Sequence, residues 1–121
     1  MNYRNAVVWN KAMQLAESVC RQSTSLPSVE RFGIRLQITR AAISVPSNIA
    51  EGWTRESRKE KRQFLAIAHG SLSELHTQLL LCLKLGWLTE RSLADAMSLI
   101  VEISKMLTSL RRQLRHTPTN S

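Results

Sequence analysis

Hydrophobic residues recur at helical spacing through most of the chain, in four successive segments. The first segment runs from about residue 5 to about residue 23, where Val8, Ala12, Leu15 and Val19 follow one another at intervals of four, three and four. These intervals place the four side chains on one face of an α-helix. A polar run and then Pro27 follow, so we expect this helix to end near Ser23.

The second segment predicts a helix that begins soon after Pro27, with Ser28 as its N-cap and Glu30 in its first turn. Pro46 falls inside the apolar pattern, which resumes in phase afterwards, so a kink is favoured over a break. Gly52 or the residues just after it end the helix. The expected core positions are Ile34, Ile38, Ala41, Val45 and Ile49.

The third segment opens on Ser57 with Glu60 three residues later, which is the pattern of a capping box. Gly86 is a suitable terminator, since glycine adopts the left-handed conformation that ends many helices. The predicted buried face consists of Phe64, Ala68, Leu72, Leu75, Leu79 and Cys82.

The fourth segment begins with Thr89 as its N-cap and Glu90 at its first position. Its apolar residues alternate spacings of three and four over three heptads, the strongest periodic signal in the chain. They are Leu93, Ala96, Ile100, Ile103, Leu107, Leu110 and Leu114. Because the connections are short, we predict an all-α, antiparallel up-down-up-down four-helix bundle over residues 1–116, followed by a polar C-terminal tail over 117–121.

Several apolar residues lie outside the four core stripes, and they have two explanations. A wide core absorbs them, or they form a subunit interface, since exposed apolar patches mark interaction sites. We predict the interface, and therefore a homo-oligomer. The residues concerned are Trp9, Phe32, Leu36, Ile43, Ala50, Trp53, Leu99 and Met106.

The charge of the chain favours polyanionic partners. Its 121 residues hold 17 Lys plus Arg against 9 Asp plus Glu, a net charge of +8, which attracts phosphate backbones without sequence specificity. Aromatic residues are only 5%, so a platform for stacking bases is poorly supplied. No signal peptide and no apolar stretch long enough for a membrane span is evident, so we expect a cytoplasmic protein with no membrane partner and with Cys20 and Cys82 as free thiols.

The basic residues form two clusters that the predicted topology brings together. One cluster lies where the second helix connects to the third, and the other lies near the end of the fourth helix. In an up-down-up-down bundle both positions are at the same end, so they form one candidate nucleic-acid-binding surface. The candidate residues are Arg55, Arg58, Lys59, Lys61, Arg62, Arg111, Arg112 and Arg115.

A polar stripe also follows one face of the second helix, opposite polar residues of the third. It has two interpretations: a hydrogen-bonded network that fixes helix register, or a groove that binds an anion or a peptide. The structural interpretation is favoured. In it, Arg40 or Arg55 pairs with Glu51 or Glu74, and Asn48 bridges them. The stripe consists of Arg40, Ser44, Asn48, Glu51 and Arg55, facing Ser71, Glu74 and Gln78.

Catalytic and metal-binding patterns are not found in the sequence. His69 and His76 are seven residues apart, whereas two metal ligands on one helix usually stand four apart. His116 lies far away in the sequence, and no Glu precedes any histidine by three residues, as di-iron bundles require. We therefore predict no catalytic residues, no metal, no cofactor and no enzymatic activity.

Two sequence stretches carry a resemblance to a known family. The first is Gln37–Gly52, which includes RAAISVPSNIAEG, and the second is Gly70–Leu75. With Val8-Trp9, Lys11-Ala12 and Leu26-Pro27, they make the chain similar to the bacterial four-helix-bundle family, also called the 23S rRNA-intervening-sequence protein or S23 family.

The resemblance implies a four-helix bundle that assembles into a ring-shaped pentamer. The family is also related to the accessory variability protein of diversity-generating retroelements, a basic pentameric ring that contacts nucleic acid and a reverse transcriptase. Transfer of that activity to this chain is an analogy at the level of the fold. Two function classes therefore stay open, a non-enzymatic oligomer that binds nucleic acid with little sequence specificity and an oligomeric scaffold for protein partners.

Overall fold

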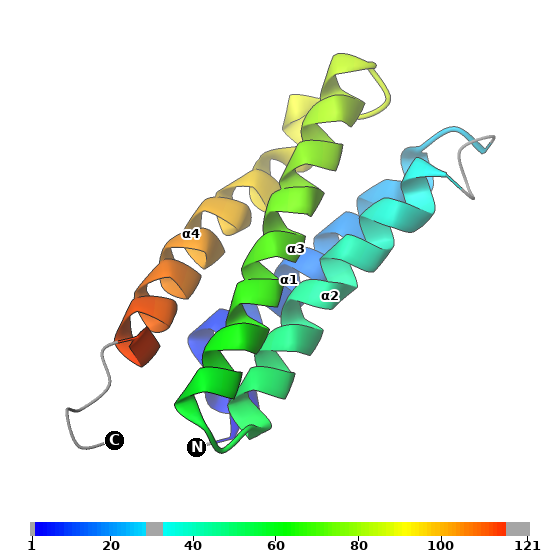
Figure 1. Cartoon of the computed structure of the whole chain (residues 1–121). Coiled ribbons are helices and arrows are strands. Elements are labelled where there is room, and N and C mark those ends of the chain that lie inside the picture. Colours follow the sequence, from blue (N-terminus) through cyan, green and yellow to red (C-terminus); the bar gives the residue numbers. More distant parts are fainter. Residues whose placement is uncertain (1, 29–32, 116–121) are drawn as a thin grey trace.

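The computed structural model describes residues 2–28 and 33–115, and within them it contains four long α-helices. They are α1 (Val7–Gln22), α2 (Ile34–Thr54), α3 (Arg58–Lys84) and α4 (Glu90–Arg115). Two short 3-10 helices flank α1, η1 (Tyr3–Asn5) before it and η2 (Ser23–Ser25) after it. Successive helices are antiparallel, and α4 packs back on α1 (Figure 1). The predicted all-α bundle topology is confirmed.

The core lies along the shared axis of the four helices and follows the predicted stripes closely. Its largest fully buried side chains come from all four helices. Phe64 is an exception, because it is only half-buried and the adjacent Leu65 occupies the core in its place. Leu65 continues the three-four alternation of α3 one turn earlier, which explains the shift. These largest fully buried side chains are Leu15, Val19, Ile38, Val45, Ile49, Leu72, Leu75, Leu79, Cys82, Leu93, Ile103 and Leu107.

The start of α2 differs from the prediction. The helix begins at Ile34 with Gly33 as its N-cap, so Ser28, six residues earlier, does not cap it. Glu30, expected in the first turn, lies outside the described residues. Glycine is among the least favourable residues within a helix, so Gly33 fits a position at the boundary. The C-terminal part was predicted correctly, since α2 runs through Pro46 and ends at Thr54.

The ends of α3 and α4 show how local chemistry sets the helix boundaries. Ser57 accepts a hydrogen bond from the backbone N–H of Glu60 at 3.0 Å, so one half of the predicted capping box is formed. Gly86 ends α3 with a φ of 74°, and the N–H of Trp87 donates to the carbonyl of Cys82 at 3.0 Å. This is the Schellman arrangement. Thr89 then caps α4, as predicted, by accepting from the N–H of Ser92 at 3.1 Å.

Gly52 allows α2 and α3 to approach closely near their connection. A Cβ at this position would lie 3.2 Å from the Cβ of Phe64 and 3.3 Å from the carbonyl oxygen of Lys61. Both neighbours belong to or adjoin the α3 backbone, so neither can move without shifting the helix. Gly52 therefore sets the distance between the two helices at this end of the bundle.

We predict that Gly52→Ala destabilises the protein by about 1–3 kcal/mol, because the added methyl group overpacks the α2–α3 contact. Gly70→Ala is the matched control: it lies in the middle of α3, and a Cβ there meets nothing within 4 Å. Since alanine favours a helix, this second change stabilises by roughly 0.5–1 kcal/mol. Urea denaturation measures both, and equal effects of the two substitutions would contradict the proposed role of Gly52.

Candidate nucleic-acid interface

The two basic clusters lie at one end of the bundle, as the topology predicts. The α2–α3 connection and the C-terminus of α4 are both at the lower end of Figure 1. They also touch, since the guanidinium of Arg58 donates to the carbonyl oxygen of Gln113 at 2.6 Å. We call this surface the basic pole. It comprises Arg55, Arg58, Lys59, Lys61, Arg62, Arg111, Arg112 and Arg115.

η1 adds a ninth basic residue to this end of the molecule. Asn5 and Ala6 line the same surface hollow as Trp53 and Leu110 of α2 and α4, which places η1, and with it Arg4, at the basic pole. Arg4 is outside both basic clusters of the sequence and was not predicted to belong to this surface. The up-down-up-down topology nevertheless places the start of α1 at this end of the bundle. The segments that form this end thus carry nine basic residues and three carboxylates, those of Glu51, Glu56 and Glu60.

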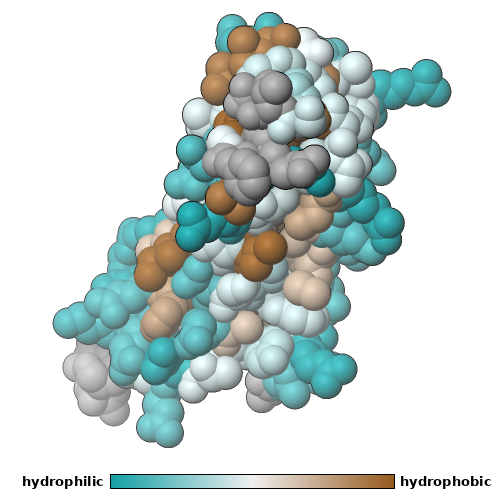
Figure 2. All heavy atoms as spheres, turned by 90° about the vertical axis from the view of Figure 1, so that its right-hand side faces the viewer, coloured by the Kyte–Doolittle hydropathy of each residue, from teal (hydrophilic) through white to brown (hydrophobic). Residues whose placement is uncertain are grey.

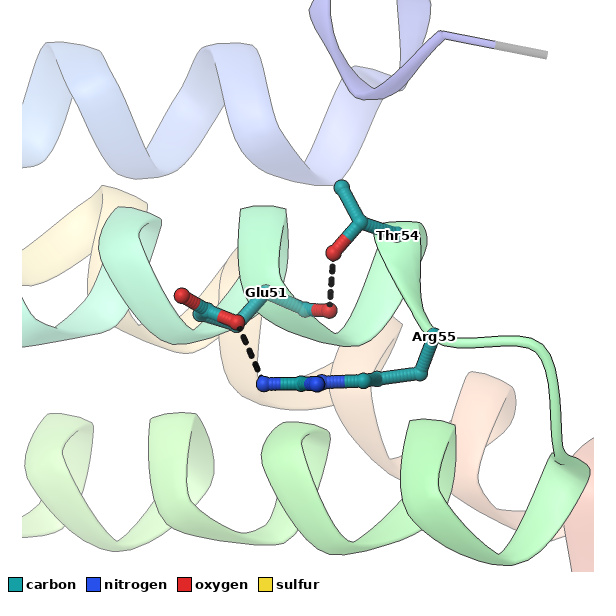
Figure 3. Close-up of polar contacts among 3 residues, drawn as sticks. All are labelled: Glu51, Thr54 and Arg55. Carbon is teal, nitrogen blue, oxygen red and sulfur yellow. Dashed lines mark hydrogen bonds and ion pairs between the residues drawn. The ribbon is translucent and has the colours of Figure 1, made fainter.

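Some of these cations stabilise the bundle itself. Arg55 forms an ion pair with Glu51 at 2.9 Å, and its guanidinium lies 4.8 Å from the ring centroid of Phe64. Figure 3 shows the Arg55 side chain extended back along α2 toward Glu51, with Thr54 bonded to the Glu51 carbonyl. In this geometry Arg55 lies against the surface of the bundle, over the ring of the half-buried Phe64.

Two further cations contact carbonyl groups at helix C-termini. The ammonium of Lys61 donates to the carbonyl of Trp53, in the last turn of α2, at 3.2 Å. Arg58 makes the equivalent contact with Gln113, in the last turn of α4. Helix C-termini carry carbonyls without intrahelical partners and partial negative charge, so cations stabilise them. The first turns of α3 therefore hold the ends of α2 and α4 in place.

Arg111 takes part in a hydrogen-bonded chain that links α3 to α4. Its guanidinium lies 2.9 Å from Nδ1 of His69, and Nε2 of His69 lies 3.0 Å from Oγ of Ser104. A guanidinium can only donate, so Nδ1 accepts and Nε2 carries the proton of a neutral imidazole. Burial, and next the charge of Arg111, lowers the pKa of His69 below its ordinary value of 6.5.

The remaining four cations of the predicted set are Lys59, Arg62, Arg112 and Arg115. None of them forms a hydrogen bond or ion pair with another described residue. Lys59 and Arg62 lie on the first turns of α3, and Arg112 and Arg115 lie on the last turns of α4. These four side chains keep their charge available to a partner.

The polar stripe is only partly a network. Oγ of Ser44 lies 2.8 Å from Oγ of Ser71, and the amide of Asn48 donates to both the carbonyl and Oγ of Ser44 at 2.8 and 2.9 Å. Seven residues along each helix, the amide of Gln78 donates to Oε1 of Gln37 at 3.4 Å. These contacts form two rungs between α2 and α3, two helical turns apart.

The charged members of the stripe behave differently. Arg55 pairs with Glu51, but Asn48 binds Ser44 and does not bridge the charges. Arg40 and Glu74 are exposed, and neither pairs with another described residue. Apart from Arg55, whose guanidinium lies over the ring of Phe64 in α3, the charged members of the stripe do not link α2 to α3. The short hydroxyl and amide groups make the remaining contacts.

Outside the basic pole and the polar stripe, few described side chains are candidates for metal binding or catalysis. Within residues 2–28 and 33–115, the structure holds no group of three or more His, Cys, Asp or Glu side chains that could bind a metal ion. Cys82 is a buried free thiol, and burial raises its pKa, while Cys20 is half-buried. His116 lies outside the described residues. No helix in the described part of the chain is long and apolar enough to span a membrane.

We predict that the neutral state of His69 makes stability depend on pH. The folded protein holds the pKa of this group below 6.5, so the unfolded chain binds its proton more readily. The contribution of neutral His69 to the free energy of unfolding is therefore complete above the pKa that this group has in the unfolded chain. It is lost as the pH falls from about 6.5 toward the lower pKa of the folded state. Thermal unfolding at a series of pH values measures this. His69→Gln should remove this pH dependence of stability, whereas His76→Gln, the matched change on α3, should retain it.

Comparisons with known proteins place the chain in a family. No curated protein matches the sequence. A solved structure, that of a protein of unknown function from the S23 ribosomal protein family of Bacteroides thetaiotaomicron, is similar with a TM-score of 0.80 and 25% sequence identity over 87% of this chain and 98% of that one. The family model of the 23S rRNA-intervening sequence protein matches residues 4–109. The chain therefore belongs to the 23S rRNA-intervening sequence protein family.

Proposed function

We propose that this protein is a non-enzymatic, cytoplasmic homo-oligomer that binds the phosphate backbone of nucleic acid through its basic pole. The convergence of nine basic residues at one end carries the proposal, because it concentrates most of the excess positive charge of the chain on one surface. Phosphate contacts by lysine and arginine supply affinity without sequence specificity. We expect binding that is strong at low salt and weak at high salt.

Contacts within the protein distinguish the cations on which the proposed binding depends most. Arg55, Arg58, Lys61 and Arg111 each have an intramolecular partner. A phosphate that displaces these contacts loosens the helix ends. Four cations have no such partner among residues 2–28 and 33–115, and they are available at no such cost: Lys59, Arg62, Arg112 and Arg115. They lie on α3 and α4, on either side of the Arg58–Gln113 contact.

We predict that K59E/R62E weakens binding to duplex RNA and DNA and lowers the slope of log K against log salt by about two. Acidic residues near the N-terminus of α3 favour the helix dipole, so the variant stays folded. The matched control is K84E/R91E, which changes the net charge equally at the opposite end of α3 and α4. Fluorescence anisotropy over a salt series measures both. Equal losses of affinity in the two variants would show that the net charge of the protein, and not the basic pole, accounts for binding to nucleic acid.

An apolar groove between α1 and α2 supports the homo-oligomer. Within it, Met13 is 45% exposed and Ile43 is 52% exposed. Figure 2, which faces the α2 side of Figure 1, shows such hydrophobic side chains among hydrophilic ones. Other residues expected at an interface, Trp9, Trp53, Leu99 and Met106, pack partly against the core. The groove is lined mainly by Trp9, Met13, Ala16, Cys20, Ile43, Pro46 and Ala50.

The subunit number we propose, five in a closed ring, follows from the resemblance of the sequence to its family. Of the other interface candidates, Leu36 is exposed and Ala50 lines the groove, while Phe32 lies outside the described residues. The same exposed apolar surface favours the second candidate function, an oligomeric scaffold that binds protein partners and not nucleic acid. The salt-dependent binding experiment separates the two functions.

We predict that the protein has a mass several times 13.7 kDa in solution and that Ile43→Glu shifts it toward the monomer. A carboxylate in the groove would have to be desolvated in the interface, which is costly. Leu85→Glu is the control, since Leu85 is 50% exposed but lies at the end of α3, away from the groove. Light scattering during gel filtration gives the masses. A wild-type mass of 13.7 kDa at micromolar concentration would exclude the oligomer.

A further inference from the structure

A cavity of about 220 Å³ opens at the basic pole. It lies where the last turn of α2 and the last turns of α4 meet the first turns of α3. Its lining is largely apolar, and Leu65, one of the lining residues, is 2% exposed. The lining residues are Gly52, Trp53, Arg58, Lys61, Leu65, Leu110, Gln113 and Leu114.

The rim of the cavity is cationic, and its cations are held in position. Lys61 is fixed by its bond to the carbonyl of Trp53, and Arg58 by its bond to the carbonyl of Gln113. The ammonium of Lys61 carries three N–H donors, so its bond to one neutral carbonyl leaves its charge effective toward a nearby anion. The cavity therefore combines an apolar interior with a positive rim.

The size of the cavity limits what it can hold. A cavity of roughly 150 Å³ accommodates benzene, whereas sites for drug-sized ligands begin near 300 Å³. A volume of about 220 Å³ thus fits one flat ring system and not a larger molecule. Trp53 and Gln113 both line the cavity. An indole ring provides a base with an aromatic surface for stacking, and a side-chain amide has a donor and an acceptor for the polar edge of a ring.

We propose that this cavity binds one unstacked base of a single-stranded nucleic acid, with the attached phosphate held at the rim by Lys61 and Arg58. This inference rests on the proposed function and names its preferred substrate, a single strand with a free base. A nucleotide unit joins a flat ring to an anion, which matches both the apolar interior and the cationic rim. Bases within a duplex are paired and stacked, so entry requires their extrusion at a cost of a few kcal/mol.

Trp53 changes the expectation based on the low aromatic content. Sequence composition argued against a platform of several stacked bases, and the cavity offers room for only one. A single stacking partner suffices here, because one base–aromatic contact already contributes measurable affinity. The surrounding cations then bind the rest of the strand through its phosphates.

The test compares three labelled probes by fluorescence anisotropy at low salt: a short single strand, a duplex of the same sequence, and a single strand whose sites are all abasic. The single strand should bind about tenfold more tightly than the abasic strand, from one base stacked in the cavity. Leu114→Trp, which fills the cavity, should abolish this difference and leave duplex binding unchanged. Leu83→Trp, the same change in a half-buried leucine at the other end of α3, should preserve it.

A second measurement does not depend on whether the Leu114→Trp variant folds. In W9F/W87F, Trp53 is the only indole, and its fluorescence should be quenched by the single strand but not by the abasic strand. Equal binding of all three probes, or equal quenching by both strands, would overturn the cavity proposal while leaving phosphate binding intact. Absence of binding to every probe would overturn the proposed function as well.

Discussion

The close approach of α2 and α3 is the constraint on which the rest of the structure depends. It is possible because small residues face one another along the contact. Gly52 admits the backbone of α3 with almost no spare room, and Ser44 and Ser71 are near enough to share a hydrogen bond of 2.8 Å. This register carries the first turns of α3 alongside the end of α2, so that Lys61 reaches the carbonyl of Trp53. The basic pole and its cavity are consequences of this contact.

The basic pole contains two groups of cations that share the same residue types. Some cations neutralise the carbonyls at the ends of α2 and α4, which would otherwise depend on water for their hydrogen bonds. Others make no contact of this kind with a described residue. A charge count treats both groups alike, although a phosphate that displaces the contacts of the first group loosens the bundle and one bound by the second group does not. Arg55, covered by its pair with Glu51 and its contact with Phe64, shows how a candidate ligand for nucleic acid can be a structural residue.

Most of the fold could be predicted from sequence, because helix periodicity and end signals are local properties. The Thr89 cap, the Gly86 terminator and the meeting of the two basic clusters at one end all followed from such signals. The start of α2 did not, since Ser28 satisfied a capping pattern while Gly33 set the boundary. Leu65 was overlooked in favour of its neighbour Phe64, because an aromatic residue and an aliphatic one are equally hydrophobic candidates until their helix is docked.

The site was less predictable, because its parts meet only through tertiary packing. Trp53 lines the same cavity as Leu110 and Leu114 of α4, an arrangement that no pattern within either helix reveals. The apolar groove and the basic pole also occupy different places, one along the side of α1 and α2 and the other at the end of the bundle. A closed ring joined through the sides of its bundles, with its axis along them, would present every pole on one face. Repeated weak phosphate contacts would then act together, so that assembly would supply the affinity that a single pole lacks.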